Sequence, residues 1–175
     1  MTTHTPDTLT AAEKRYETNL KRTEKSLPGW RTPARRRFLI RANWASLLIM
    51  AAIALVSYFW FPIIIAWLPM TVVVITAWVM LRITIDSKDT APARYLDELE
   101  TATLLEARSR ALNLTNWGLW TIALVLIFGA SLEIGDGFRL AYTMGALGIL
   151  TFLGSSVIPA AAMARTMNDE AAGQN

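Results

Sequence analysis

Four carboxylates lie within ten positions of one another in the middle of the chain: Asp97, Glu98, Glu100 and Glu106. Two carboxylates held close together can act as a general acid and a general base. Three arginines share the same stretch: Arg94, Arg108 and Arg110. Glu106 and Arg110 are four residues apart, which is the favourable spacing for an ion pair along a helix. Mixed charges on one helix are typical of a solvated, ion-paired face, and the sequence predicts that rather than a catalytic set.

Other reactive residue types are scarce. The chain has no cysteine, which excludes disulfides, thiolate metal sites and cysteine catalysis. The single histidine, His4, lies in a polar N-terminal stretch, where we expect it to be inert. Serines and threonines occur without a histidine or lysine base close by in sequence, so nucleophilic catalysis has no support. We therefore predict a protein that is not an enzyme, with no catalytic, cofactor-binding or metal-ligating residues.

Five arginines precede the first long apolar stretch: Arg31, Arg35, Arg36, Arg37 and Arg41. Arginines at this position usually determine which way a membrane protein is oriented. They also attract anionic lipid headgroups, at about 1 kcal/mol per charge near the surface. Membrane lipids are thus expected partners. Nucleic acid is not, because the chain shows no folded basic domain that could bind it.

The distribution of charge predicts the elements that position these residues. Residues 42–81, 111–132 and 140–164 contain no Asp, Glu, Lys, Arg or His. A membrane-spanning helix needs about 20 apolar residues, so the first stretch holds two spans and the others one each. The predicted fold is all-α, a bundle of four transmembrane helices forming two hairpins. The expected spans cover residues 40–60, 62–82, 113–133 and 140–163.

Positive charge also predicts the orientation. Of the 17 Lys and Arg residues, ten lie in residues 1–41, five in residues 82–110 and one at Arg165, leaving only Arg139 for the other side. By the positive-inside rule, the side of the membrane that carries these sixteen residues is cytoplasmic. We therefore expect a protein of the cytoplasmic membrane with cytoplasmic segments 1–37 and 165–175 flanking a membrane domain, 38–164. The layout resembles small four-span membrane proteins of bacteria, although no motif identifies one family.

Two charged helices are expected outside the membrane. Thr10 and Glu13 fit a capping box for a helix over residues 10–25, whose thin apolar stripe calls for a partner or the membrane surface. Residues 1–9 are expected to be disordered, and residues 27–30 to end this helix. A second helix over 92–112, capped by Asp89 or Thr90 and opened by Pro92, is expected to join spans two and three. No Pro or Gly interrupts residues 93–117, so it could continue directly into span three.

Small and polar residues within the spans predict helix packing. Asn43 and Asn116 near two span entries could hydrogen-bond across the bundle, face the headgroups, or line a polar path, and we favour the first two. Three glycines of span four, Gly145, Gly148 and Gly154, would allow close approach of another helix. Pro69 and Pro159 are expected to kink spans two and four.

The two halves of the chain share a short pattern. Residues 35–44 align without gaps on residues 108–117, with identical residues at five of ten positions. A duplication would explain this, with each half a charged helix followed by a hairpin. Convergence would explain it equally, because Arg and Trp are both expected where a span leaves the cytoplasm.

The functional hypothesis follows mainly from what the spans lack. Within the predicted spans, Asp, Glu, Lys, Arg and His occur only at the very ends, as Arg41, Arg82 and Glu133, which argues against proton coupling through a buried carboxylate. We expect a non-enzymatic accessory, assembly or interaction protein that acts through its cytoplasmic helices, which pack on each other, on a second copy or on a protein partner. The alternative is a small oligomeric transporter or channel without a buried carboxylate.

Overall fold

The computed structural model describes residues 10–23, 26–133 and 135–173, and within them all regular structure is helical. The elements are α1 (Ala11–Thr23), α2 (Pro33–Phe59), α3 (Trp67–Thr84), α4 (Glu98–Ser131) and α5 (Gly137–Gly173), with short 3-10 helices η1 (Pro28–Trp30), η2 (Phe61–Ala66), η3 (Lys88–Thr90) and η4 (Ala93–Tyr95). The predictions for residues 1–9 with His4, and for the helix end at residues 24–25, lie outside the described residues.

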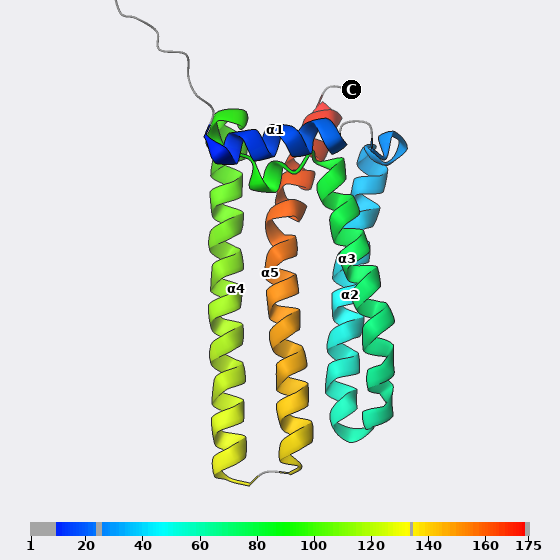
Figure 1. Cartoon of the computed structure of the whole chain (residues 1–175), viewed down its shortest axis with the longest axis vertical. Coiled ribbons are helices and arrows are strands. Elements are labelled where there is room, and N and C mark those ends of the chain that lie inside the picture. Colours follow the sequence, from blue (N-terminus) through cyan, green and yellow to red (C-terminus); the bar gives the residue numbers. More distant parts are fainter. Residues whose placement is uncertain (1–9, 24–25, 134, 174–175) are drawn as a thin grey trace, which may run out of the picture.

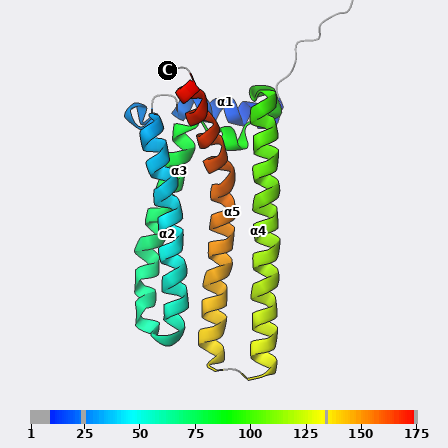
Figure 2. The same ribbon diagram turned by 180° about the vertical axis from the view of Figure 1, so that it is seen from behind.

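Four helical segments of the described chain are long and apolar enough to cross a membrane: Pro33–Phe59, Phe61–Thr84, Glu98–Ser131 and Gly137–Gly173. Their most apolar windows have mean hydropathies of 1.6 to 2.3. This confirms the predicted all-helical protein with four helices able to span a membrane. α5 lies in the middle, with α4 on one side and the α2–α3 pair on the other (Figures 1 and 2).

The two ends of the bundle differ in what they carry. The connections between α2 and α3 and between α4 and α5 lie together at one end, which we call the turn end (Figure 1). α1, the η3–η4 linker and the end of α5 lie at the opposite end, which we call the cap end (Figure 1). This separation places nearly all the charged side chains at the cap end.

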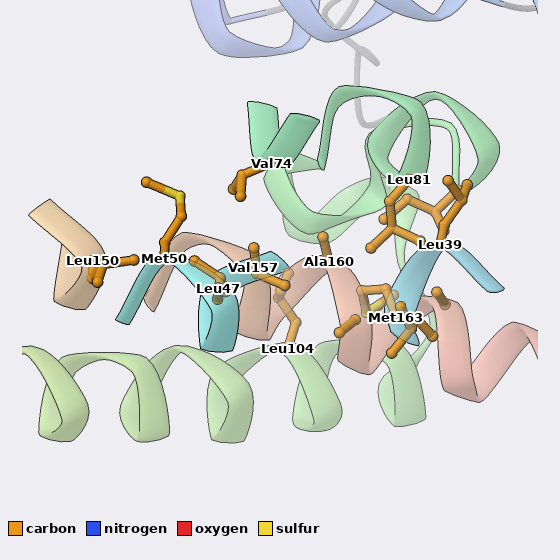
Figure 3. Close-up of a cluster of buried hydrophobic side chains, with 14 of the residues drawn as sticks. Leu39, Leu47, Met50, Val74, Leu81, Leu104, Leu150, Val157, Ala160 and Met163 are labelled. Atoms are coloured by element: carbon orange, nitrogen blue, oxygen red, sulfur yellow. The ribbon is translucent and has the colours of Figure 1, made fainter. Parts of the chain in front are cut away.

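Apolar side chains from α2, α3, α4 and α5 form the core, as Figure 3 shows. Met50, Leu81 and Met163 are fully buried within it. In the most apolar windows of α2 and α5, 39% of residues are buried, against 11% in the segment Phe61–Thr84 and 6% in α4. Lipid tails are as apolar as these side chains, so in a membrane this core stabilises the bundle by close packing rather than by the hydrophobic effect.

α4 approaches α5 closely at two glycines, Gly118 and Gly129. A methyl group at Gly118 would lie 2.5 Å from Cγ2 of Thr151 on α5, so only glycine fits there without a shift of Thr151. A methyl group at Gly129 would meet the side chain of Leu140 on α5. Of the glycines predicted to pack, Gly148 and Gly154 lie at ordinary contact distance from α4 side chains, and Gly145 is exposed with open space beside it. Close packing of α4 on α5 therefore involves two glycines of span three rather than the glycines predicted in span four.

At the turn end the two connections interlock. Gly135 has φ of +71°, and a side chain there would overlap the Tyr58 hydroxyl. Arg139, the single positive charge at this end, donates from Nη1 to the carbonyl oxygens of Tyr58 and Phe59, at 3.3 and 3.4 Å. It thus satisfies backbone acceptors that the end of α2 leaves free. Ile134, in the connection between α4 and α5, lies outside the described residues.

The second span opens as the 3-10 helix η2, and Pro69 falls in the first turn of α3, where its missing N–H costs no helical hydrogen bond. The start predicted for the second charged helix was wrong. The helix expected from residue 92 begins at Glu98, where Asp97 and Glu100 form a capping box. From there α4 runs without a break to Ser131, through the predicted entry into span three.

Candidate functional site

The cap end concentrates the polar chemistry of the described chain. α1 lies across it, over the linker between α3 and α4 (Figure 1). Its first turn is closed by the predicted capping box, in which Thr10 N–H donates to Glu13 Oε2 at 2.6 Å and Glu13 N–H donates to Thr10 Oγ1 at 3.3 Å. These bonds lower the pKa of Glu13. Such a short helix is marginal alone, and here the linker supplies its partner.

The inner face of α1 is aromatic and acidic. Tyr16 is buried and packs its ring 5.0 Å from that of Tyr95 in η4. The Tyr95 hydroxyl donates to Glu17 at 2.8 Å, and Glu13 lies 3.8 Å from Arg94. Burial is the main cause of the raised pKa of Tyr16, so this phenol stays protonated at neutral pH. α1 is therefore attached to the linker by both ring packing and charge.

The outer face of α1 is basic. Lys14, Arg15, Lys21 and Arg22 are all exposed, whereas Glu13 and Glu17 are only partly exposed. Their spacing places the four cations on the side of the helix opposite Tyr16, because residues three to four apart share a helix face. The result is a basic surface, which we call the α1 basic face, turned away from the bundle.

A strained turn follows α3. Asp86 and Ser87 have φ of 54° and 53°, in the left-handed region that costs a non-glycine residue about 1–2 kcal/mol. Arg31 Nη1 lies 2.8 Å from the Asp86 carboxylate, and Arg31 Nη2 donates to the Thr23 carbonyl at the end of α1 at 3.0 Å. Arg31 thereby holds this turn and α1 together.

Asp89 is the most deeply buried charge of the linker. Its carboxylate lies 2.9 Å from Arg82 Nε, and its carbonyl oxygen accepts from Arg108 Nη2 at 2.9 Å. Burial raises the pKa of Asp89, and the positive charge of Arg82 only partly offsets this. The guanidinium of Arg82 also stacks 5.0 Å from the Trp78 ring. This pair fixes the linker to the ends of α3 and α4.

Glu100 is buried rather than part of a solvated face, contrary to the prediction for the four carboxylates. It pairs with Lys88 of η3, and its backbone N–H donates to Asp97 Oδ1 at 2.6 Å. Carboxylate oxygens of Asp97, Glu100 and Glu170 lie within 4.8 Å of one another. Lys88 already supplies a positive charge to this group, so we assign it a structural role. Glu106 and Arg110 form the predicted ion pair, at 2.5 Å.

The five arginines predicted to face headgroups divide into two sets. Arg31, Arg35 and Arg36 make contacts within the chain: Arg35 Nη1 donates to the Gly29 carbonyl at 2.6 Å, and Arg36 Nη1 donates to Asn168 Oδ1 at 3.4 Å. Arg36 is buried. Arg37 and Arg41 are exposed, and only these two are fully available to lipid.

The two matched asparagines occupy different environments. Asn43 is fully buried and donates from Nδ2 to the Leu39 carbonyl of its own helix at 3.0 Å, whereas Asn116 is exposed on α4. The matched leucines differ in the same way, since Leu39 is 2% and Leu112 64% exposed. The predicted hydrogen bond between Asn43 and Asn116 across the bundle is therefore wrong.

Four residues of this end carry much of the network: Arg82, Asp86, Asp89 and Asn168. Sequence patterns did not single out Arg82, Asp86 or Asn168, and they indicated Asp89 only as a helix cap. One signal in the sequence could have indicated this network: segment 82–89 directly follows a predicted span and has a charged residue at each end. Four ion pairs join described side chains beneath the α1 basic face: Arg31 with Asp86, Arg82 with Asp89, Lys88 with Glu100, and Arg94 with Glu13.

Comparison of the chain with protein-family models, with curated proteins and with solved structures finds no match.

Proposed function

We propose that the protein is a four-span protein of the cytoplasmic membrane with the cap end in the cytoplasm. Sixteen of the 17 Lys and Arg residues belong to segments on the predicted inner side, and Arg139 is the exception. The apolar helices support membrane insertion, and the positive charges support this orientation.

We further propose that it acts as a non-enzymatic accessory or assembly protein that docks an acidic protein surface on the α1 basic face. The observation that carries this proposal is that the acidic side chains of α1 point at the linker and its cations point away. Because one face of α1 already packs on the linker, its opposite face remains available to a second partner. Complementary charge raises the rate and the specificity of such association.

The alternative of a small oligomeric transporter or channel ranks second. It was motivated partly by the paired asparagines, and Asn43 and Asn116 lie in different environments. Flux in proteoliposomes would support it, and loss of that flux in Asn43→Leu would assign it to the bundle core.

Orientation can be tested directly because the sequence has no cysteine to remove. Thr18→Cys lies on exposed α1, and Gly137→Cys lies at the turn end, where a side chain meets open space. In intact cells a membrane-impermeant maleimide should label Gly137→Cys at once and Thr18→Cys only after permeabilisation. The reverse pattern would overturn the proposed orientation.

Docking can be tested with the full chain in mild detergent. The test variant replaces Lys14, Arg15, Lys21 and Arg22 by Gln, and the control replaces exposed Arg37 and Arg41 by Gln. Cross-linking and mass spectrometry should find a protein bound to the wild type and the control but not to the test variant. Binding should weaken in 1 M salt, where charges are screened beyond about 3 Å. A partner retained equally by both variants, or no partner at all, would contradict the proposal.

A further inference from the structure

An open apolar groove runs along the bundle between α2 and α4, with α5 behind it. Its volume is about 470 Å³. All three helices line it, with residues that include Trp44 and Ala51 of α2, Trp117 and Thr121 of α4, and Thr151 and Gly154 of α5. Trp44 and Trp117, matched in the sequence pattern of the two halves, thus line the same groove.

A smaller polar hollow adjoins the groove on the side of the cap end. Its volume is about 100 Å³, and it shares Trp44 with the groove. Arg110, Glu106 and Arg165 line it. Arg110 is paired with Glu106, whereas the Arg165 side chain is exposed, so the hollow has an excess of one positive charge.

Each of the three helices carries an arginine above the groove in register with its lining residues. Arg41 precedes Trp44 by three residues, Arg110 precedes Trp117 by seven, and Arg165 follows Gly154 by eleven. All three spacings keep residues on one helix face. An apolar channel headed by guanidiniums matches a ligand with an apolar chain and an anionic head, since guanidinium binds phosphate through paired hydrogen bonds.

We propose that this groove binds one anionic phospholipid, with an acyl chain in the groove and the phosphate on Arg110 and Arg165. The inference rests on the proposed insertion in the membrane. Trp44 and Ala51 are seven residues apart, so the α2 wall is about 10 Å long at 1.5 Å per residue. This is shorter than one leaflet, about 15 Å or half of the hydrocarbon core. An acyl chain ends within a leaflet, whereas a helix of a second copy would need a surface along the whole span.

The test uses native mass spectrometry of the full chain in detergent, titrated with phosphatidylglycerol or with phosphatidylcholine of the same acyl chains. The wild type should retain one phosphatidylglycerol per chain in preference to phosphatidylcholine. Arg110→Gln with Arg165→Gln should weaken phosphatidylglycerol binding about thirtyfold, from about 1 kcal/mol per lost charge. Thr121→Phe, which places a ring in the groove from an exposed position, should reduce the retention of both lipids.

Matched controls separate the groove from general effects. Arg15→Gln removes one charge from α1, and Ala123→Phe adds a ring to an exposed position of α4 that does not line the groove, so both should bind lipid like the wild type. Circular dichroism and gel filtration check that each variant is folded.

Four results would overturn the proposal: equal retention of the two lipids by the wild type, phosphatidylglycerol binding unchanged by the arginine variants, displacement of the lipid by inorganic phosphate alone, or a lipid-free dimer whose contact is lost in Thr121→Phe. The proposed membrane placement fails separately, if alkaline carbonate extracts the protein from membranes.

Discussion

The Tyr16 hydroxyl donates a hydrogen bond to the carbonyl oxygen of Asp86 at 3.3 Å, which ties α1 to a turn seventy residues further along the chain. The same turn is held from its other side by Arg31. The position of the α1 basic face thus depends on a contact between an amphipathic helix and a strained turn, and it can be disturbed without touching the bundle.

Tyr16→Ala should release α1 from the cap end. It removes a buried ring, its packing on Tyr95 and its hydrogen bond to Asp86, whereas Tyr16→Phe removes only the hydrogen bond, worth about 0.5–1.5 kcal/mol. Trypsin should cleave α1 faster in Tyr16→Ala than in Tyr16→Phe, and slowest in the wild type. Exposed Asn19→Ala is the control. Equal cleavage in all four proteins would show that Tyr16 does not hold α1.

Asp89→Asn should remove a stabilisation that grows at acid pH. Burial raises the pKa of Asp89 in the folded protein above 3.8, its ordinary value, so between these two values the folded state binds more protons than the unfolded state. Stability from this group therefore increases as pH falls through the raised pKa, and it is lost as pH rises. In thermal unfolding measured from pH 7 to pH 4, the stability of the wild type relative to Asp89→Asn should increase as the pH falls.

Glu13→Gln gives the opposite sign and serves as the control for that measurement. Hydrogen bonds from Thr10 lower the pKa of Glu13 in the folded protein, so its contribution is present near neutral pH and is lost as pH falls through the lowered pKa. The wild type should lose its advantage over Glu13→Gln on acidification. The same trend in both variants would mean that neither carboxyl controls the pH dependence.

Asn168→Ala should destabilise the fold through Arg36. Arg36 is buried, and loss of the Asn168 acceptor leaves its guanidinium short of a partner, at a cost of about 1–3 kcal/mol. Arg36→Met combined with Asn168→Leu should recover part of this loss, because apolar side chains need no partner. Thermal unfolding in detergent measures both effects, with exposed Arg37→Met as the control. If Asn168→Ala and Arg37→Met unfold at the same temperature, the contact between Arg36 and Asn168 does not stabilise the fold.

Gly118→Ala should separate α4 from α5. The added methyl meets the side chain of Thr151, which is branched at Cβ and cannot easily turn aside, so the expected cost is about 1–3 kcal/mol. Thr151→Ala in the same chain should restore stability. Gly145→Ala, with open space beside it, should be neutral or stabilising by about 0.5–1 kcal/mol. Failure of Thr151→Ala to rescue Gly118→Ala would place the close contact elsewhere.

Sequence patterns were sufficient where one physical constraint dominates. Charges are costly in a bilayer, so the charge-free stretches identify the four long helices. The spacing of Thr10 and Glu13 correctly predicts the start of α1, because a capping box is local chemistry. The continuous helix of α4 follows in the same way from the lack of Pro and Gly in residues 93–117.

Patterns failed where distant residues compete for the same group. Aspartate is a residue type that favours helix caps, but Asp89 is buried against Arg82, and Asp97 caps α4 instead. Arg36 and Asn168 are 132 residues apart, so no local signal connects them. Apolar spans also lack a polar face that would show which side packs inward, and this explains why Gly118 was missed.

The central position of α5 has a consequence for biosynthesis. α2 and α3 can pair soon after synthesis, but α4 packs chiefly on α5, which is made after it. At about 5–20 residues per second, the ribosome needs several seconds to complete α5. During that time α4 lacks its main intramolecular neighbour, and we expect the insertion machinery to contact it until α5 is made.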